Sequence, residues 1–307
     1  MAFGAAEVKA LREQTGAGMM DCKKALTETD GDIDAAVDWL RTKGLAAAAK
    51  KAGRVTAEGL VAMAVAGNKG ALVELNAETD FVARNEQFQE LVGQMAEAAV
   101  EHGGSVDSLK AATLPNGKSV EQSVVDAIAT IGENMTLRRT AQLAVSEGVV
   151  ASYVHNAAAP NKGKIGVLVA MQSSGDKDRL AEVGKQVAMH VAAANPLALN
   201  RDQVNAEDVE RERAVLIEQA KASGRPDNII EKMVEGRMRK FYEESVLLEQ
   251  AFVIDPDKSV GKAIEELAKE LGTAVTCTGF VRMALGEGVD REESDFAAEV
   301  AATLKKD

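Results

Sequence analysis

The stretch EGLVAMAVAGNKGALVEL, residues 58–75, places two apolar runs on either side of a short turn. The turn, GNKG at 67–70, is made of residue types that tight hairpin turns favour. This arrangement predicts a β-hairpin. A similar stretch further along begins with EGVVASYV at 147–154 and continues through the turn NKGK at 161–164 into the apolar run 165–171. The sequence therefore predicts two hairpins of the same kind.

Each hairpin leads into a segment with apolar residues at helical spacing. The order strand, turn, strand, helix thus occurs twice. This repetition predicts an α+β fold whose core consists of two related subdomains, each a small antiparallel sheet covered by helices. The helical stripes are Phe88, Leu91, Val92, Met95 and Ala96 after the first hairpin, and Leu180, Val183, Val187, Ala188 and Val191 after the second.

Residues 1–54 predict an N-terminal module of three helices that resembles the ubiquitin-associated type. The third helix has a continuous apolar face. We expect Asp30 or Asp32 to cap this helix and Gly44 to end it, so that residues 45–54 form a connector of helical propensity. The apolar face consists of Ile33, Ala36, Val37 and Leu40, which follow the spacing i, i+3, i+4, i+7.

Residues 206–250 are rich in Glu, Arg and Lys, with one interruption, SGRPD at 223–227. A narrow line of apolar residues on both sides of the interruption predicts an antiparallel helical hairpin that projects from the body. Such a hairpin is either a solvated strut or a partner-binding arm. After it, the pattern predicts a strand at 273–284 that rejoins the second sheet, and a last helix at 296–304.

These patterns divide the chain into consecutive predicted parts. An N-terminal module precedes the two core subdomains, the helical hairpin is inserted into the second of them, and a C-terminal helical module follows. The expected bounds are 1–54 for the N-terminal module, 55–143 for the first core subdomain, 144–200 plus 252–286 for the second, 201–251 for the inserted hairpin (a coiled coil) and 287–307 for the C-terminal module.

The net charge of −12 argues against nucleic acid as the main partner, because phosphate binding requires a concentrated basic surface. No stretch approaches the roughly eighteen apolar residues of a membrane span, and the first residues lack the basic and apolar regions of a signal peptide. Cys22 and Cys277 lie far apart and form no CxxC motif. A cytoplasmic protein with reduced thiols is the simplest interpretation.

The residues that commonly carry chemistry form no catalytic or metal-binding motif in this sequence. His102, His155 and His190 occur singly and have no zinc spacing with the cysteines. The chain has no GxxxxGK[ST] or GxGxxG loop for phosphates and no GxSxG nucleophile motif. We therefore expect no metal, no cofactor and no enzymatic activity.

Five stretches along the chain, taken in order, resemble segments of one known family. They are LREQTGAGMMDCKKAL at 11–26, ETDFVARNEQF at 78–88, IGVLVA at 165–170, EKMVEGRMRKF at 231–241 and GEGVDREESDFAAEVA at 286–301. In this order they resemble the bacterial elongation factor Ts family over essentially the whole chain. The resemblance implies a guanine nucleotide exchange factor of translation elongation, without covalent chemistry. Its implied partner is elongation factor Tu, whose GDP complex it binds so that Mg²⁺ and GDP leave and GTP enters.

Within the second stretch, Asp80 and Phe81 stand where a strand gives way to a helix. From the residues alone, Asp80 caps the helix and Phe81 packs near its first turn. The resemblance implies that Thr79, Asp80, Phe81 and Val82 enter the nucleotide-binding domain of the partner. There Phe81 acts as a wedge, and Asp80 disturbs the groups that hold Mg²⁺. The two interpretations are compatible, since a capped turn holds a protruding aromatic rigidly.

The resemblance also implies partner contacts in the first stretch, at Arg12, Met20 and Lys23. Met20 beside Lys23 has the character of an exposed, adaptable contact. Met19 has the spacing of the apolar face of its helix, so we expect it to face inward. For Met19 core packing is therefore favoured, and a partner contact is the alternative.

His155 comes directly after a strand of the second hairpin, before a loop at 156–162 that we expect to be long. The resemblance implies a partner contact for this histidine, and a surface histidine without a role is the alternative. Two other functions are open: a scaffold or coiled-coil chaperone with many partners, and a hydrolase that uses Glu78, Asp80 and His155. A higher-order complex of two factor–partner pairs is open as well.

Overall fold

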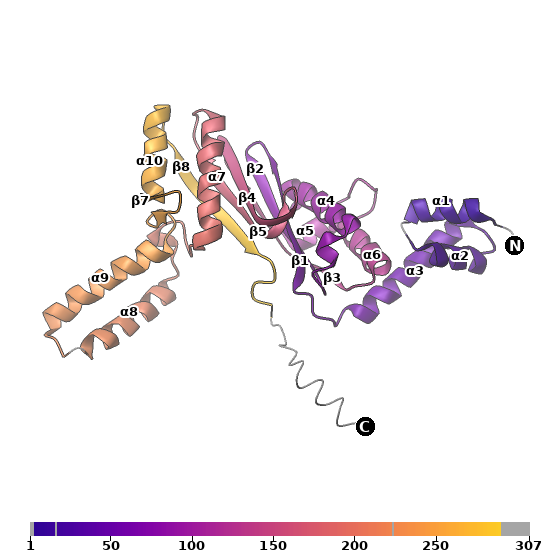
Figure 1. Ribbon diagram of the computed structural model, residues 1–307, viewed down its shortest axis with the longest axis horizontal. Helices are drawn as coiled ribbons and strands as arrows, with labels where there is room; N and C mark the ends of the chain where they lie inside the picture. The colour runs from indigo at the N-terminus through magenta and orange to yellow at the C-terminus, as the bar shows by residue number, and fades with distance from the viewer. Residues whose placement is uncertain (1–2, 16, 223, 290–307) are drawn as a thin grey trace, which may run out of the picture.

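The computed structural model describes residues 3–15, 17–222 and 224–289. In Figure 1 three N-terminal helices lie at one end of an elongated molecule, a helical hairpin lies at the other end, and the sheet lies between them. The α-helices are α1 (Ala5–Thr15), α2 (Met19–Glu28), α3 (Ile33–Lys51), α4 (Glu86–His102), α5 (Val106–Ala111), α6 (Val120–Ile131), α7 (Lys177–Ala194), α8 (Ala206–Lys221), α9 (Asp227–Ser245) and α10 (Val260–Leu271). The strands are β1 (Glu58–Ala66), β2 (Lys69–Ala77), β3 (Met135–Ala144), β4 (Gly148–Ala159), β5 (Lys162–Gln172), β6 (Ala251–Phe252), β7 (Asp255–Ser259) and β8 (Thr276–Ala284), and the 3-10 helices are η1 (Val82–Arg84) and η2 (Arg201–Gln203). The mixture of helices and antiparallel strands agrees with the predicted α+β class.

Both predicted hairpins are confirmed: β1 pairs with β2, and β4 pairs with β5. The glycine of each EG pair explains why the two stretches are alike. Gly59 has φ +118° and Gly148 has φ +127°, a region that L side chains rarely adopt. A Cβ atom on Gly59 would lie 2.2 Å from the carbonyl oxygen of Leu75, and one on Gly148 would lie 2.1 Å from that of Met171. Glycine is therefore required at the same place in both hairpins.

The two small sheets that the sequence predicts are joined into one. Six strands form an antiparallel sheet in the order β3-β2-β1-β5-β4, and β8 also pairs with β5. The junction between the halves is short, because β1 and β5 share only the pairs Val61↔Gly163 and Ala62↔Lys162. The predicted strand at 273–284 is confirmed as β8, and β6 and β7 form a separate two-stranded sheet.

Each half of the sheet has its own core beneath one long helix. The apolar stripe of α4 packs on β1 and β2, and that of α7 packs on β4 and β5, as the helical spacing predicts. A third cluster, drawn from both hairpins and β8, holds the halves together. Its buried members are Val61, Leu72, Val150, Leu168 and Met283.

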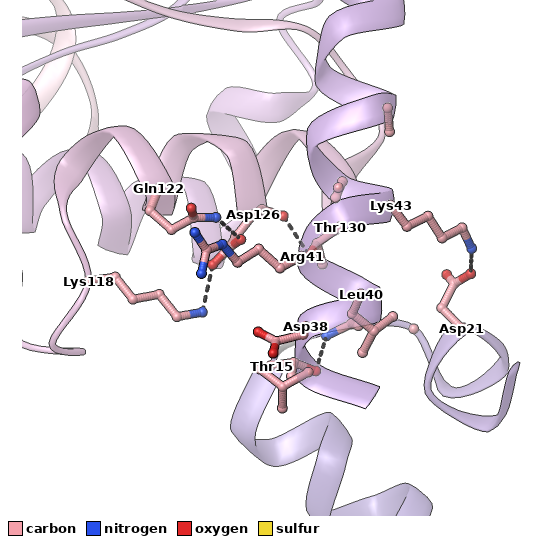
Figure 2. A pocket seen from close by; sticks show the side chains of 16 residues that line it. Thr15, Asp21, Asp38, Leu40, Arg41, Lys43, Lys118, Gln122, Asp126 and Thr130 are labelled. Carbon is pink, nitrogen blue, oxygen red and sulfur yellow. Dashed lines mark hydrogen bonds and ion pairs between the residues drawn. The ribbon is translucent and has the colours of Figure 1, made fainter. Parts of the chain in front are cut away.

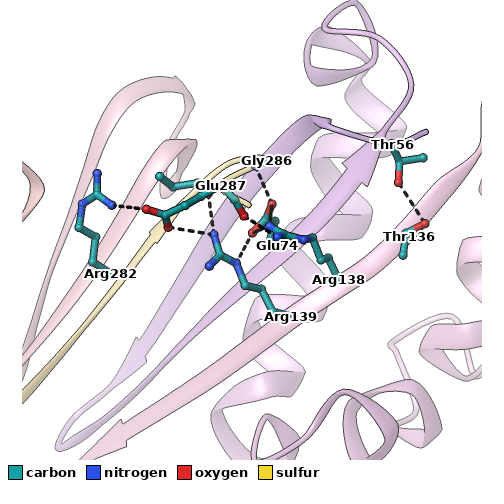
Figure 3. A network of polar contacts seen from close by, with 9 residues as sticks. Thr56, Glu74, Thr136, Arg138, Arg139, Arg282, Gly286 and Glu287 are labelled. Carbon is teal, nitrogen blue, oxygen red and sulfur yellow. Dashed lines mark hydrogen bonds and ion pairs between the residues drawn. The ribbon is translucent and has the colours of Figure 1, made fainter. Parts of the chain in front are cut away.

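A buried carboxylate reinforces the connection between the halves (Figure 3). Glu74 on β2 is fully buried and binds Arg138 and Arg139 of β3. It also accepts a hydrogen bond from the backbone N–H of Gly286, at 2.8 Å, just after β8 ends. The carboxylate of Glu287 binds Arg139 in turn, at 3.6 Å. The end of β8 is thereby fixed to β2 and β3.

The third helix is longer than the sequence predicts. Asp32 caps α3 as expected, accepting from the backbone N–H of Ala35 at 2.9 Å. The prediction that Gly44 ends the helix is wrong, because α3 continues through Lys51. Gly44 is buried inside the helix, and a Cβ atom there would lie 3.4 Å from the Cβ of Ala129 on α6. That distance is an ordinary van der Waals contact, so Gly44 lies where α3 packs on α6 and does not mark a helix end.

The predicted helical hairpin is confirmed as α8 and α9, with an apolar seam between them. Leu216 and Ala220 of α8 pack with Ile230, Val234 and Met238 of α9. Within the described ranges no helix is long and apolar enough to cross a membrane. The predicted last helix at 296–304 lies outside the described residues.

Candidate functional site

The turn between β2 and η1 presents an aromatic ring to solvent. Phe81 is 75% exposed, and its neighbour Asp80 is exposed as well. The ring therefore does not pack near the first turn of the following helix, as the residues alone predict. Single exposed apolar side chains are common on protein surfaces, so whether this one marks a contact site depends on how the turn is held. Because the ring projects, it is available to another molecule.

Hydrogen bonds fix the base of this turn. Thr79 donates to Glu133 twice, from its backbone N–H at 2.9 Å and from its hydroxyl at 2.6 Å. The carboxylate of Glu78 accepts from the backbone N–H of Asn134 and pairs with Arg54 at 3.3 Å. The turn is therefore bound both to the segment that follows α6 and to the segment that follows α3.

The other side of the turn is anchored in the core. Val82, directly after Phe81, is 3% exposed and packs in the cluster beneath α4. The backbone N–H of Arg84 donates to the carbonyl of Phe81 at 3.1 Å, and that of Ala83 donates to the carbonyl of Asp80 at 3.2 Å. Phe81 thus directly precedes a single turn of 3-10 helix, and the first residue of that turn, Val82, is buried.

The expectation that Asp80 caps the following helix is wrong. The cap of α4 is Asn85, whose side chain accepts from the backbone N–H of Phe88 at 3.1 Å. The 3-10 turn η1 separates Asp80 from α4, so the carboxylate is too early in the chain to cap it. No residue in the described ranges donates a hydrogen bond to the Asp80 side chain. This carboxylate is therefore free to interact with groups outside the protein.

A second exposed surface lies on the N-terminal helices. Met20 at the start of α2 is 74% exposed. Lys23 on the same helix and Arg12 on α1 are exposed as well. The expectation that Met19 faces inward is wrong, since it is 52% exposed. Met19 is the first residue of α2, and helical side chains tilt toward the N-terminus, so its side chain extends past the end of the helix. Cys22, one turn later, is buried as the spacing predicts.

The surroundings of His155 differ from the expected loop. The histidine is exposed within β4, and the hydroxyl of Tyr153 lies 3.2 Å from its Nδ1 atom. Residues 156–162 do not form a long loop, because β4 continues to Ala159 and β5 begins at Lys162. The strand pairing is irregular between Ala157 and Ala159, where β4 has one residue more than β5.

The structure does not bring together the side chains that the hydrolase hypothesis requires. Glu78 binds Asn134 and Arg54, and His155 pairs with Tyr153. Within the described ranges, no group of three or more His, Cys, Asp or Glu side chains could hold a metal ion.

The supporting residues of the turn were not found by sequence reasoning. Glu133 and Asn134 follow α6, a helix for which no pattern was identified, and they lie more than fifty positions from the residues they bind. Arg54 lies in the segment 45–54, which the sequence predicts only as a connector. No local signal in the sequence marks any of them as part of the site.

Exposed aromatic and methionine side chains on rigid supports are typical of a surface that binds another protein. Comparison with known proteins identifies which kind. The family model described as Elongation factor TS matches residues 78–287. The chain is similar to proteins named "Elongation factor Ts" from Agrobacterium fabrum (strain C58 / ATCC 33970), at 63% identity over 98% of both chains, and from Sinorhizobium medicae (strain WSM419), at 62% identity over 99% of this chain and 100% of the relative. The chain therefore belongs to the elongation factor Ts family, as its motifs indicated, and so to the elongation factors of protein biosynthesis.

Proposed function

We propose that the protein is a guanine nucleotide exchange factor for elongation factor Tu. It binds the GDP complex of this GTPase in the cytoplasm, displaces Mg²⁺ and promotes release of GDP so that GTP binds. The family membership supports the proposal, and the exposed Phe81 on its fixed turn is the single observation that carries it. The protein performs no covalent chemistry in this scheme.

The energetic basis is a coupling between two ligands of the partner. If the factor weakens GDP binding, GDP weakens binding of the factor by the same ratio. A factor that bound the GDP-loaded and nucleotide-free partner equally would shift nothing. Each tenfold loss of GDP affinity requires about 1.4 kcal/mol, and a loss of several decades requires on the order of 5 kcal/mol. An interface of standard size can supply that amount.

The turn at Phe81 is suited to deliver this energy. Thr79 and Val82 hold the turn on either side, so the backbone that carries the ring keeps its position when the partner resists it. In the proposal, Phe81 enters the nucleotide-binding domain of the partner as a wedge. Asp80, whose carboxylate has no hydrogen bond within the described ranges, disturbs the groups and waters around Mg²⁺. Because Mg²⁺ demands near-ideal octahedral geometry, small shifts of its surroundings weaken its binding.

The remaining site residues hold the partner while the wedge acts. We assign this role to Arg12, Met19, Met20 and Lys23 on the N-terminal helices and to His155 on β4. All five side chains are exposed. Methionine adapts to irregular surfaces, and the basic residues supply charge at the rim of the interface. The hairpin of α8 and α9 is either a strut or an additional arm, and a complex of two factor–partner pairs is compatible with this assignment.

The experiment that tests the function measures release of a fluorescent GDP analogue from purified elongation factor Tu by stopped flow. We expect the full chain to accelerate release in proportion to its concentration until saturation, and excess GDP to dissociate the two proteins. A release rate that does not change when the chain is added contradicts the proposal. A pull-down that retains many partners without any dependence on nucleotide supports the scaffold hypothesis.

A further inference from the structure

A cavity of about 340 Å³ lies between the N-terminal helices and α6 (Figure 2). One wall comes from α3 and the other from α6, and Thr15, Ala17 and Gly18 line one end. Ligand pockets of this size commonly lie where two parts of a protein meet. The two walls meet at Gly44 of α3 and Ala129 of α6, both of which line the cavity.

Much of the cavity wall is apolar. Val37, Leu40 and Ala47 contribute from α3, and Ala129 contributes from α6. Val37 and Leu40 are half-buried, so part of the apolar surface of α3 remains uncovered by the other two N-terminal helices. An apolar body of a small molecule would cover it.

The charged side chains around the opening differ in whether they have a hydrogen-bond or ion-pair partner. The carboxylate of Asp126 accepts from Lys118 at 2.6 Å and from Gln122 at 2.9 Å. Lys43 pairs with Asp21. Arg41 has no ion pair and no hydrogen bond from its side chain within the described ranges. In Figure 2 its guanidinium group extends across the opening toward Gln122 and Asp126.

We propose that this cavity binds a small organic monoanion, with its apolar body between α3 and α6 and its carboxylate or sulfonate on Arg41. A guanidinium group has five N–H donors in a planar arrangement that suits such an anion. Asp38, which also lines the cavity and lies nearer Thr15 in Figure 2, disfavours a second negative charge on the ligand. The site is separate from Phe81, so the proposal does not depend on nucleotide exchange.

The test uses 1-anilinonaphthalene-8-sulfonate, an aromatic monosulfonate whose fluorescence rises in apolar surroundings. The full chain is titrated with the dye, and we expect saturable binding of one dye per chain. Arg41→Gln removes the charge from an exposed side chain and leaves the apolar wall in place; we expect at least about tenfold weaker binding. Arg239→Gln on α9 removes an exposed arginine far along the chain and serves as the matched control, with unchanged binding.

A second variant tests the location independently of charge. Ala47→Phe places a ring in the cavity, and we expect the dye to be excluded while circular dichroism shows the same helix content. Binding to Arg41→Gln as tight as to the unchanged chain overturns the proposal. It is also overturned if a folded Ala47→Phe variant binds the dye normally, or if the unchanged chain shows no saturable binding. If Ala47→Phe does not fold, the comparison of Arg41→Gln with Arg239→Gln decides alone.

Discussion

Thr79 is bound to Glu133 through both its backbone N–H and its hydroxyl, at 2.9 and 2.6 Å. The two residues lie 54 positions apart in the sequence. One is the residue before Asp80, and the other follows α6. Through these two hydrogen bonds, the segment that follows α6 determines the position of the exposed turn.

Glu133→Ala removes this support. The backbone N–H of Thr79 loses its partner in a partly buried place, so we expect a loss of about 1–3 kcal/mol in the free energy of unfolding. Because the turn is then less rigid, nucleotide release from the partner slows several-fold. Urea unfolding and stopped-flow release measure the two effects.

The matched control for this change is Glu97→Ala, an exposed glutamate on α4 that has no hydrogen bond or ion pair within the described ranges. It should leave both quantities nearly unchanged. Equal behaviour of the two variants would show that Glu133 does not support the turn.

Glu74→Gln tests the buried network that joins the halves of the sheet (Figure 3). The change leaves Arg138 and Arg139 partly buried without their carboxylate, and breaking a buried ion pair costs about 3–5 kcal/mol. We expect the decrease in the free energy of unfolding to lie near the lower end of this range, because the amide of the glutamine still accepts one hydrogen bond. Glu101→Gln removes an exposed ion pair to Lys69 and should cost less than about 1 kcal/mol. The comparison is made by urea unfolding, and equal losses would contradict the assigned role of Glu74.

His190 makes stability depend on pH. It is buried on α7, where its Nδ1 atom accepts from the backbone N–H of Val253 at 3.2 Å and its Nε2 atom lies 2.8 Å from Oε1 of Gln250. Burial lowers the pKa of this imidazole, and the hydrogen bond to Gln250 opposes that effect. The neutral form is thus favoured in the folded protein, while the unfolded chain takes up a proton below about pH 6.5.

The sign follows from proton uptake by the unfolded state. The contribution of His190 is complete above pH 6.5 and decreases as the pH falls, by at most about 1.4 kcal/mol per pH unit. Between pH 6.5 and 5.5 we expect the free energy of unfolding of the unchanged chain to decrease more steeply than that of His190→Asn. If the free energies of unfolding of the two chains, measured with urea, decrease equally with pH, this histidine does not contribute to the pH dependence.

Met20→Ala tests the N-terminal surface. Fewer than about 30% of interface side chains cost more than about 1 kcal/mol when truncated. We expect Met20 to be one of them, with roughly tenfold weaker binding of the partner. Stability should not change, because the side chain is 74% exposed. Leu45→Ala on α3, which is 48% exposed and outside the proposed surface, is the control. Isothermal titration calorimetry measures the affinity of each variant for elongation factor Tu. If Met20→Ala binds as tightly as Leu45→Ala, Met20 is excluded from the interface.

Much of the fold could be predicted from local patterns. The two hairpins and the apolar stripes of α4 and α7 each depend on residues close together in the sequence. The turns themselves are shorter than the predicted 67–70 and 161–164, because β2 begins at Lys69 and β5 begins at Lys162. The position of the turn at Phe81, between a strand and a helix, was also predicted, but the residues alone predicted a packed Phe81, and the side chain is exposed.

What could not be predicted depends on contacts between distant residues. Glycine is common at helix ends, but α3 continues through Gly44 to Lys51, and Gly44 is buried beside Ala129 of α6. Met19 has the spacing of a core residue, but no element covers the start of α2 at its position. The bond from Thr79 to Glu133 and the network around Glu74 likewise become visible only when the strands and helices are assembled.

The central claim is tested most directly by Phe81→Ala. The ring is exposed, so the variant should fold with unchanged stability, and the contacts of the N-terminal helices should still bind the partner. We predict that, at saturating concentrations of the variant, release of fluorescent GDP from elongation factor Tu is at least about tenfold slower than with the unchanged chain, which corresponds to a release barrier about 1.4 kcal/mol higher. Release that is as fast as with the unchanged chain, at equal binding of the partner, would contradict the account.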